Sequence, residues 1–174
     1  PLHLVDGETL HVPGSLRSKT GTPYRVFTPF NRALRAQLTL PAAHTPPSRF
    51  EPAAEFPSGF QVRPAPSIED LGISRNPQLL TGGESQAQKR LMSFLKGPAS
   101  SYSSLRDRMD EAGTSRLSAD LKFGLLAPST VWRAAEASRL PESEIRKFTD
   151  ELIWREFNYS TLWDSPEVLK KPFR

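Results

Sequence analysis

The pattern of apolar and polar residues is clearest from about Pro141 to Leu162, where it predicts a long helix. At about 100° per residue, this helix has two apolar sides. The first contains Ile145, Phe148, Leu152, Tyr159 and Trp163, and the second contains Ile153 and Phe157. The polar strip of the helix contains Glu151, Trp154, Arg155 and Asn158. Because a helix that is apolar on two sides is buried on both, the polar strip is a candidate recognition surface.

Shorter patterns precede this helix. Thr28 is a good N-cap and Pro29 suits the first helical turn, so a short basic helix is predicted from about Pro29 to Leu38. Further helices are predicted over residues 84–96, 101–109, 119–123 and 129–138. Two runs near the N-terminus, Leu2–Val5 and Thr22–Phe27, have the composition of short strands.

Proline dominates the middle of the chain. Residues 41–77 hold eight of the 17 prolines, and proline both removes a backbone donor and disfavours helix at the preceding residue. A linker is therefore predicted there, rather than a helix or a central strand. The predicted fold class is mainly α, with an α/β remnant over residues 1–40, the linker over 41–77 and a helical part over 78–174.

Composition excludes several kinds of chemistry. The chain has no cysteine, so it has no disulfide, thiolate metal site or cysteine nucleophile. His3, His11 and His44 share no ligand spacing, and no glycine-rich phosphate loop or nucleophile elbow occurs. Metal and hydrolase chemistry therefore have no support, and no run is long and apolar enough for a transmembrane helix.

The positive charge lies mainly in the first part of the chain. The net charge is +4, and residues 1–50 contain six Lys or Arg residues against two acidic ones. The remaining residues balance at 17 basic and 17 acidic. Net charge alone is therefore a weak argument for nucleic-acid binding, which must rest on local arrangement instead.

The loop Gly113–Ser118 allows two interpretations. Its hydroxyl groups precede a helix and could simply cap it. The same hydroxyls, with backbone N–H groups and the charge of Arg116, could instead bind a phosphate or diphosphate.

Two pairs spaced by four residues also remain open. Tyr102 and Arg106 share a helix face, either as surface residues or as part of a site. Glu151 and Arg155 could form an ordinary ion pair on the helix surface. Trp154 argues against that simple interpretation, because an indole among charges is costly unless it contacts something, such as a base.

Taken in order, these motifs resemble the DNA photolyase/cryptochrome family. The run Gly113–Gly124 looks like the flavin-binding loop and the helix after it, and Glu151–Phe157 looks like the lesion-site helix. Tyr24–Phe30 resembles the last element of the antenna domain. The resemblance covers nearly the whole chain except the proline-rich linker, and it is most like class I cyclobutane pyrimidine dimer photolyases.

The resemblance implies an α/β antenna domain followed by an all-helical domain that binds FAD. Residues 1–40 would then be the C-terminal end of the antenna domain, and residues 78–174 the N-terminal half of the FAD-binding domain. The chain is therefore expected to be an internal segment that is inactive when isolated. A second antenna chromophore of the folate or deazaflavin type is possible in the parent protein.

The family's functional residues transfer to matching positions here. The residues expected to contact FAD are Tyr102, Thr114, Ser115, Arg116, Leu117, Ser118 and Phe148. Those expected to contact DNA are Arg106, Glu151, Trp154, Arg155 and Asn158. Among them, Glu151 would hydrogen-bond the damaged pyrimidine and Trp154 would pack against the flipped dimer, which makes these two the expected catalytic residues.

The implied mechanism is light-driven electron transfer, in which reduced and excited FAD donates an electron to a cyclobutane pyrimidine dimer flipped out of the duplex. An alternative is a cryptochrome-like blue-light photoreceptor without repair activity, and another is a small helical interaction module with accidental motifs. The resemblance further implies a monomer that binds damaged DNA, has no membrane contact and works in the bacterial cytoplasm, at the nucleoid.

Overall fold

The structure is a computed structural model that describes residues 7–40, 42, 48–49, 59, 61 and 63–172. Contacts divide the chain into two units, one made of residues 1–42 and 82–174 and the other of residues 43–81. The predicted strand Leu2–Val5 lies outside the described residues.

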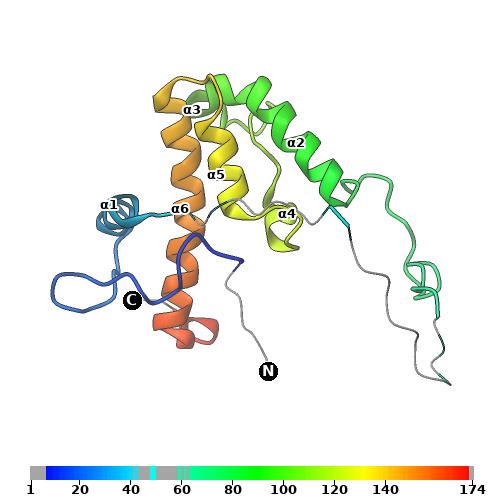
Figure 1. Ribbon diagram of the computed structural model, residues 1–174, viewed down its shortest axis with the longest axis horizontal. Coiled ribbons are helices and arrows are strands. Elements are labelled where there is room, and N and C mark those ends of the chain that lie inside the picture. The colour runs from blue at the N-terminus through cyan, green and yellow to red at the C-terminus, as the bar shows by residue number, and fades with distance from the viewer. Residues whose placement is uncertain are drawn as a thin grey trace. The chain divides into compact units, whose positions relative to one another are not determined.

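The regular elements of the described residues are all helical (Figure 1). The α-helices are α1 (Phe27–Gln37), α2 (Glu84–Lys96), α3 (Tyr102–Leu105), α4 (Ser118–Lys122), α5 (Pro128–Glu136) and α6 (Glu142–Asp164). Two 3-10 turns are η1 (Pro98–Ser101) and η2 (Pro166–Leu169). The prediction of a mainly α fold is therefore confirmed, and none of the described helices is long and apolar enough to cross a bilayer.

The predicted strand over Thr22–Phe27 is wrong. This segment has no strand, and Phe27 already begins α1, with the extended residue Val26 as its N-cap. Thr28 therefore lies inside the helix instead of capping it. The β-prone composition has no partner strand among the described residues, and the Phe27 ring packs on α6 instead, so tertiary contacts override local propensity.

The long helix α6 is the central element of the larger unit, and it contacts α1, α3 and α5 (Figure 1). Phe148 and Leu152 are buried on one of its sides, while Ile153 and Phe157 are buried on another. The predicted burial on two sides is thus confirmed for these four residues, but it is wrong for Trp163, which was assigned to the first side and is 66% exposed. The burial leaves the strip with Glu151 and Trp154 only partly covered.

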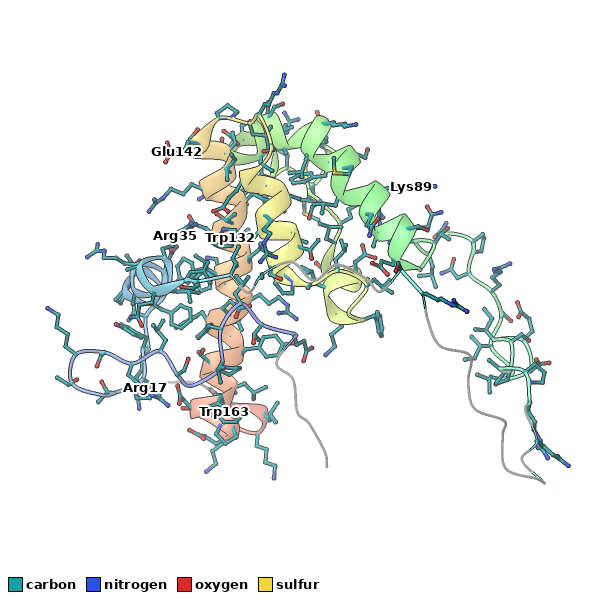
Figure 2. The ribbon with its side chains drawn as sticks, in the orientation of Figure 1. Arg17, Arg35, Lys89, Trp132, Glu142 and Trp163 are labelled. Atoms are coloured by element: carbon teal, nitrogen blue, oxygen red, sulfur yellow. The ribbon has the colours of Figure 1, made fainter. Side chains whose placement is uncertain are left out.

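Polar contacts fasten α1 along α6. The Asn31 side-chain amide donates to the Asp150 carboxylate at 2.7 Å, and the Arg35 guanidinium donates to the same oxygen at 2.7 Å. Arg35 also lies 5.1 Å from the centre of the Trp132 ring on α5, and Figure 2 shows these two side chains close together. Arg35 therefore joins three helices, while Phe30 of α1 is 1% exposed in the core.

A buried carboxylate attaches the N-terminal segment to α6. Glu156 is fully buried, and one of its oxygens accepts a hydrogen bond from the Leu10 backbone N–H at 2.8 Å. The same oxygen lies 3.2 Å from Nδ1 of His11. Near the end of α6, Arg17 forms an ion pair with Asp164 at 2.8 Å. These contacts hold the segment before α1 against the C-terminal half of α6.

The smaller unit, residues 43–81, contains turns but no helix or strand among its described residues. Asp70 closes one turn, since its carboxylate accepts hydrogen bonds from the Ser67 N–H at 2.9 Å and the Ser67 hydroxyl at 2.7 Å. These bonds lower the pKa of Asp70. The described residues of this unit thus lack helix and strand, as expected, and their role as a linker between domains stays a prediction.

We predict that Glu156→Ala lowers the free energy of unfolding by about 2–3 kcal/mol, because it leaves the buried Leu10 N–H without its acceptor. Urea denaturation of the whole protein measures this change. The control is Glu167→Ala, which removes an exposed carboxylate from η2 and should change stability by less than about 0.5 kcal/mol. Equal stability of the two variants would contradict the anchoring role of Glu156.

Candidate functional site

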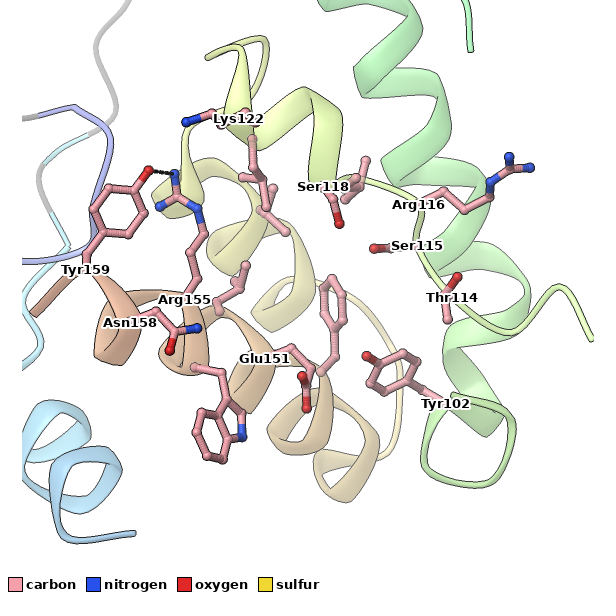
Figure 3. Close-up of a pocket in the computed structure, with 16 residues that line it drawn as sticks. Tyr102, Thr114, Ser115, Arg116, Ser118, Lys122, Glu151, Arg155, Asn158 and Tyr159 are labelled. Atoms are coloured by element: carbon pink, nitrogen blue, oxygen red, sulfur yellow. Dashed lines mark hydrogen bonds between the residues drawn. The ribbon is translucent and has the colours of Figure 1, made fainter. Parts of the chain in front are cut away.

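A pocket of about 720 Å³ opens between α6, α5, α4, the start of α3 and the loop before α4 (Figure 3). It lies in the larger unit. Every residue predicted to belong to a site lines this pocket except Arg106. Figure 3 shows Thr114, Ser115 and Ser118 on one side and Arg155, Asn158 and Tyr159 on the other, with Glu151 between them. The two motifs, separate in the sequence, are therefore brought together.

Glu151 has a different partner from the one that its spacing offers. Its carboxylate accepts a hydrogen bond from the Arg106 guanidinium and not from Arg155. This bond raises the pKa of Arg106, so the guanidinium stays charged. Arg106 is not part of the pocket lining, but it fixes the orientation of the Glu151 carboxylate, which is. The alternative of a simple Glu151–Arg155 surface pair is not formed.

Arg155 is held by the N-terminal segment. Its guanidinium donates to the Glu8 backbone carbonyl at 2.5 Å and to the Tyr159 hydroxyl at 3.2 Å. The Tyr159 hydroxyl in turn donates to the Glu8 carboxylate at 2.8 Å. Burial and the bond to Glu8 raise the pKa of Tyr159, so this phenol stays protonated at neutral pH.

Tyr102 is a buried residue, so the alternative of a surface tyrosine is wrong. It is 6% exposed and packs edge-on against Phe94 and Phe148, with ring centroids 5.7 and 5.5 Å away. The predicted shared face with Arg106 is confirmed, since that guanidinium lies 5.9 Å from the ring centre. Burial and the charge of Glu151 raise the pKa of Tyr102, so its hydroxyl remains a hydrogen-bond donor at neutral pH.

The hydroxyls of the loop before α4 do not cap that helix. The N-cap is Leu117, and no side chain bonds to the first turn. In the described part of the chain, the hydroxyls of Thr114, Ser115 and Ser118 have no protein hydrogen-bond partner. Thr114 and Ser118 are exposed, so their hydroxyls are available to a ligand. The capping interpretation is therefore wrong for these side chains.

Two backbone features shape this loop. Gly113 is buried, and a Cβ there would lie 2.7 Å from the carbonyl oxygen of Leu105. Arg116 has a φ of 53°, the left-handed region that non-glycine residues rarely adopt. This conformation accompanies an exposed Arg116 side chain and a buried Leu117. Strained residues of this kind cluster at active sites and ligand clamps, which makes this loop a candidate for ligand binding.

A buried ion pair holds the other end of the loop. Asp120 on α4 is 1% exposed and accepts hydrogen bonds from Arg90 on α2, at 3.0 Å from Nε and 2.5 Å from the terminal nitrogen. Sequence patterns give no indication of this pair, because the two residues lie on separate helices. It fixes α4, and with it Ser118, relative to α2.

The pocket combines positive charge with an apolar wall. Arg116, Lys122 and Arg155 line it against a single carboxylate, that of Glu151. The apolar lining consists of Leu117, Leu121, Val131, Phe148 and Leu152. Free hydroxyls and cations suit a diphosphate, and the apolar wall suits a flat ring system, so the lining fits a dinucleotide-like cofactor. The described residues contain no cluster able to hold a metal ion.

Sequence reasoning missed two polar residues of the lining, Lys122 and Tyr159. Lys122 is four residues after Ser118 and so shares its side of α4, a spacing that could have indicated its place. Tyr159 was assigned to the apolar side of the long helix, which its half-buried ring supports. Its hydroxyl bonds to Glu8, a contact that no local pattern contains.

Comparisons with known proteins find several similar chains. The family model described as DNA photolyase matches residues 1–52. A deoxyribodipyrimidine photo-lyase of Agrobacterium fabrum is 33% identical over 95% of this chain and 35% of its own length. One of Thermus thermophilus is 34% identical over 99% of this chain and 36% of its own. The chain thus spans about a third of the length of these curated relatives.

A solved structure is also similar. The crystal structure of a bacterial class III photolyase from Agrobacterium tumefaciens matches with a TM-score of 0.72 and 30% identity. The match covers 95% of this chain and 35% of that one. At this identity and coverage, the likeness extends over sequence and fold together.

We predict that Gly113→Ala lowers the free energy of unfolding by about 1–3 kcal/mol, because the new methyl group meets the Leu105 backbone, which cannot move aside. The matched control is Gly82→Ala, where a Cβ would have nothing within 4 Å and the change should stay below about 0.5 kcal/mol. Chemical denaturation of both variants makes the comparison. A Gly113→Ala variant as stable as the control would show that the loop can shift freely.

Proposed function

Because the chain belongs to the DNA photolyase family, we propose that the whole protein is a flavin-dependent photolyase that splits cyclobutane pyrimidine dimers with light. The observation that carries this proposal is the shared pocket, in which a hydroxyl-rich loop faces a helix strip with Glu151 and Trp154. The names of the relatives contain the substrate class, deoxyribodipyrimidine, which supports the same choice here.

We propose that FAD binds on the loop side of the pocket. The hydroxyls of Thr114, Ser115 and Ser118 would donate to its phosphates, and Arg116 would supply positive charge. Phe148 would pack against the ring system, since it lies in the pocket wall in contact with the Tyr102 ring. When bound and reduced, FAD supplies an excited-state electron for the repair reaction.

The polar strip of α6 would bind the damaged DNA. Trp154 is 40% exposed in the pocket wall, which makes it available for stacking with an unpaired base. Glu151 would accept a hydrogen bond from the pyrimidine, with its carboxylate oriented by Arg106. Arg155 and Asn158 extend the strip and would contact the DNA beside the lesion.

Arg106 has two proposed tasks. The resemblance assigns it to a DNA phosphate, while its partners in the structure are the carboxylates of Glu151 and Asp107. A guanidinium has five N–H donors, so one group can hold Glu151 and still donate to a phosphate. Its side chain is 21% exposed, which leaves room for that second contact.

The finer assignments made from the sequence stay predictions. The resemblance to class I enzymes rests on Glu151 and Trp154, whereas the solved relative is described as class III. The antenna chromophore, the monomeric state, the location at the bacterial nucleoid and the antenna-domain origin of residues 1–40 likewise remain proposals.

The direct test of the proposed function is a repair assay with the whole protein. We expect blue light to remove cyclobutane dimers from irradiated DNA when the bound flavin is reduced, and an identical sample kept in the dark to retain them. Chromatography of the digested DNA measures the dimers that remain. Flavin-loaded protein that leaves the dimers intact in light would favour the photoreceptor alternative.

The proposed cofactor site is tested by removing its hydroxyls. A triple variant with Thr114→Ala, Ser115→Ala and Ser118→Ala should bind FAD at least about tenfold more weakly, because three hydrogen bonds of about 0.5–1.5 kcal/mol each are lost. Flavin fluorescence on dilution measures the dissociation constant.

The matched control for this variant is another triple substitution of serines. Ser85, Ser93 and Ser143 are exposed on α2 and α6 and lie outside the pocket, so changing all three to alanine should leave FAD affinity unchanged. Equal flavin affinity of the two triple variants would argue against the loop as the phosphate site.

A further inference from the structure

Trp154 is stacked on a residue from the N-terminal part of the chain. The ring centroids of Trp154 and Phe27 are 3.7 Å apart, and the ring planes differ by 4°. Phe27 thus covers one face of the indole. Trp154 is nevertheless 40% exposed and lines the pocket, so the remaining face is the one left open to a ligand.

A third aromatic ring, that of Phe157, packs against both Trp154 and Phe27. Phe157 lies one turn after Trp154 on α6 and meets both rings by their edges, with centroids 5.8 Å from Trp154 and 6.0 Å from Phe27. The interplanar angles are 78° and 75°, an edge-to-face arrangement that aromatic pairs favour. Phe157 is 9% exposed, so this side of the cluster belongs to the core.

The register of two helices keeps Phe27 in place. Phe27 and Asn31 are four residues apart on α1, and Trp154 and Asp150 are four apart on α6, so each pair lies on one helix face. Asn31 bonds to Asp150 at 2.7 Å while Phe27 stacks on Trp154. These two contacts between α1 and α6 lie one helical turn apart. The hydrogen bond from Asn31 to Asp150 therefore fixes the position of the Phe27 ring against Trp154.

From these contacts we infer that Phe27 is a positioning residue for Trp154, holding the indole so that one face is presented for stacking with a base of the flipped dimer. The inference rests on the proposed function of Trp154 and adds α1 to the lesion site. A large ring at an exposed helix position would otherwise move between rotamers. Fixing it before binding lowers the ordering cost of the complex.

The inference has a geometric consequence for the substrate. With one face of the indole occupied by Phe27, a base can stack only on the other face. The platform is therefore one-sided and binds at most one stacked base. The Phe27 ring acts through its flatness, because a branched aliphatic side chain of similar size cannot lie parallel to the indole over its whole area.

The test is the affinity of the whole, flavin-loaded protein for a dimer-containing oligonucleotide in the dark. Phe27→Leu keeps apolar volume but removes the flat ring, and should weaken binding about threefold to tenfold, the range of aromatic-pair free energies. Phe27→Tyr keeps the ring and should bind like the unaltered protein. Equal affinity of these two variants would overturn the inference.

A double-variant cycle shows whether Phe27 acts through Trp154. Trp154→Ala should weaken binding more than Phe27→Leu, and adding Phe27→Leu to it should produce no further loss. Independent, additive losses would overturn the positioning role while leaving the stacking platform intact. If Trp154→Ala binds the lesion normally, the platform itself fails and the inference falls with it, which separates the two outcomes.

The matched control for losing an aromatic ring is Phe123→Ala. Phe123 is 78% exposed after α4 and is not part of the pocket lining, so its removal should leave the affinity for the dimer unchanged. Flavin absorbance and thermal unfolding of each variant confirm that cofactor and fold are retained. A loss with Phe123→Ala equal to that with Phe27→Leu would show a general effect of ring removal and overturn the inference.

Discussion

The burial of α6 on two sides is the constraint on which the rest of the larger unit depends. This helix has 23 residues, and its two apolar sides are covered by different parts of the chain. The core around Phe148 and Leu152 lies on one side, and α1 packs against Phe157 on the other. The polar strip, together with the adjoining Phe148 and Leu152, borders the pocket, so the position of the site follows from how the core is packed.

The N-terminal segment completes this arrangement through polar contacts. Burying the Glu156 carboxylate is costly unless hydrogen bonds replace its water. The Leu10 N–H and His11 contact one of its oxygens, while the other oxygen has no hydrogen-bond partner among the described residues. Because Glu156 follows Arg155 directly, the segment that bonds to the buried carboxylate also brings Glu8 to the Arg155 guanidinium. The bond between Glu156 and Leu10 thus stabilises the fold, and the bond between Arg155 and Glu8 positions a residue of the pocket wall.

Much of the helical fold could be predicted from the sequence, because apolar periodicity reports burial directly. On α6, Phe148, Leu152, Ile153 and Phe157 are buried as expected, whereas Trp163, near the end of the helix, is 66% exposed. The start of α1 could not be predicted, since the β-prone run before it is decided by the packing of Phe27 on another helix. Residues of the site were found where they share one helix face or one loop.

The partners of the site residues could not be predicted, and they come from segments that are distant in sequence. Arg106 orients Glu151, Phe27 supports Trp154, and Glu8 holds Arg155. Asn158 has no hydrogen-bond partner within the described residues, so in this strip its amide is the group most available to a ligand. Periodicity thus identifies which side chains face the pocket, whereas long-range contacts determine which of them are fixed. Glu151, Trp154 and Arg155 are therefore held in place, as accurate stacking and charge placement require. The Asn158 amide, at the end of the strip, is free to adapt to a ligand.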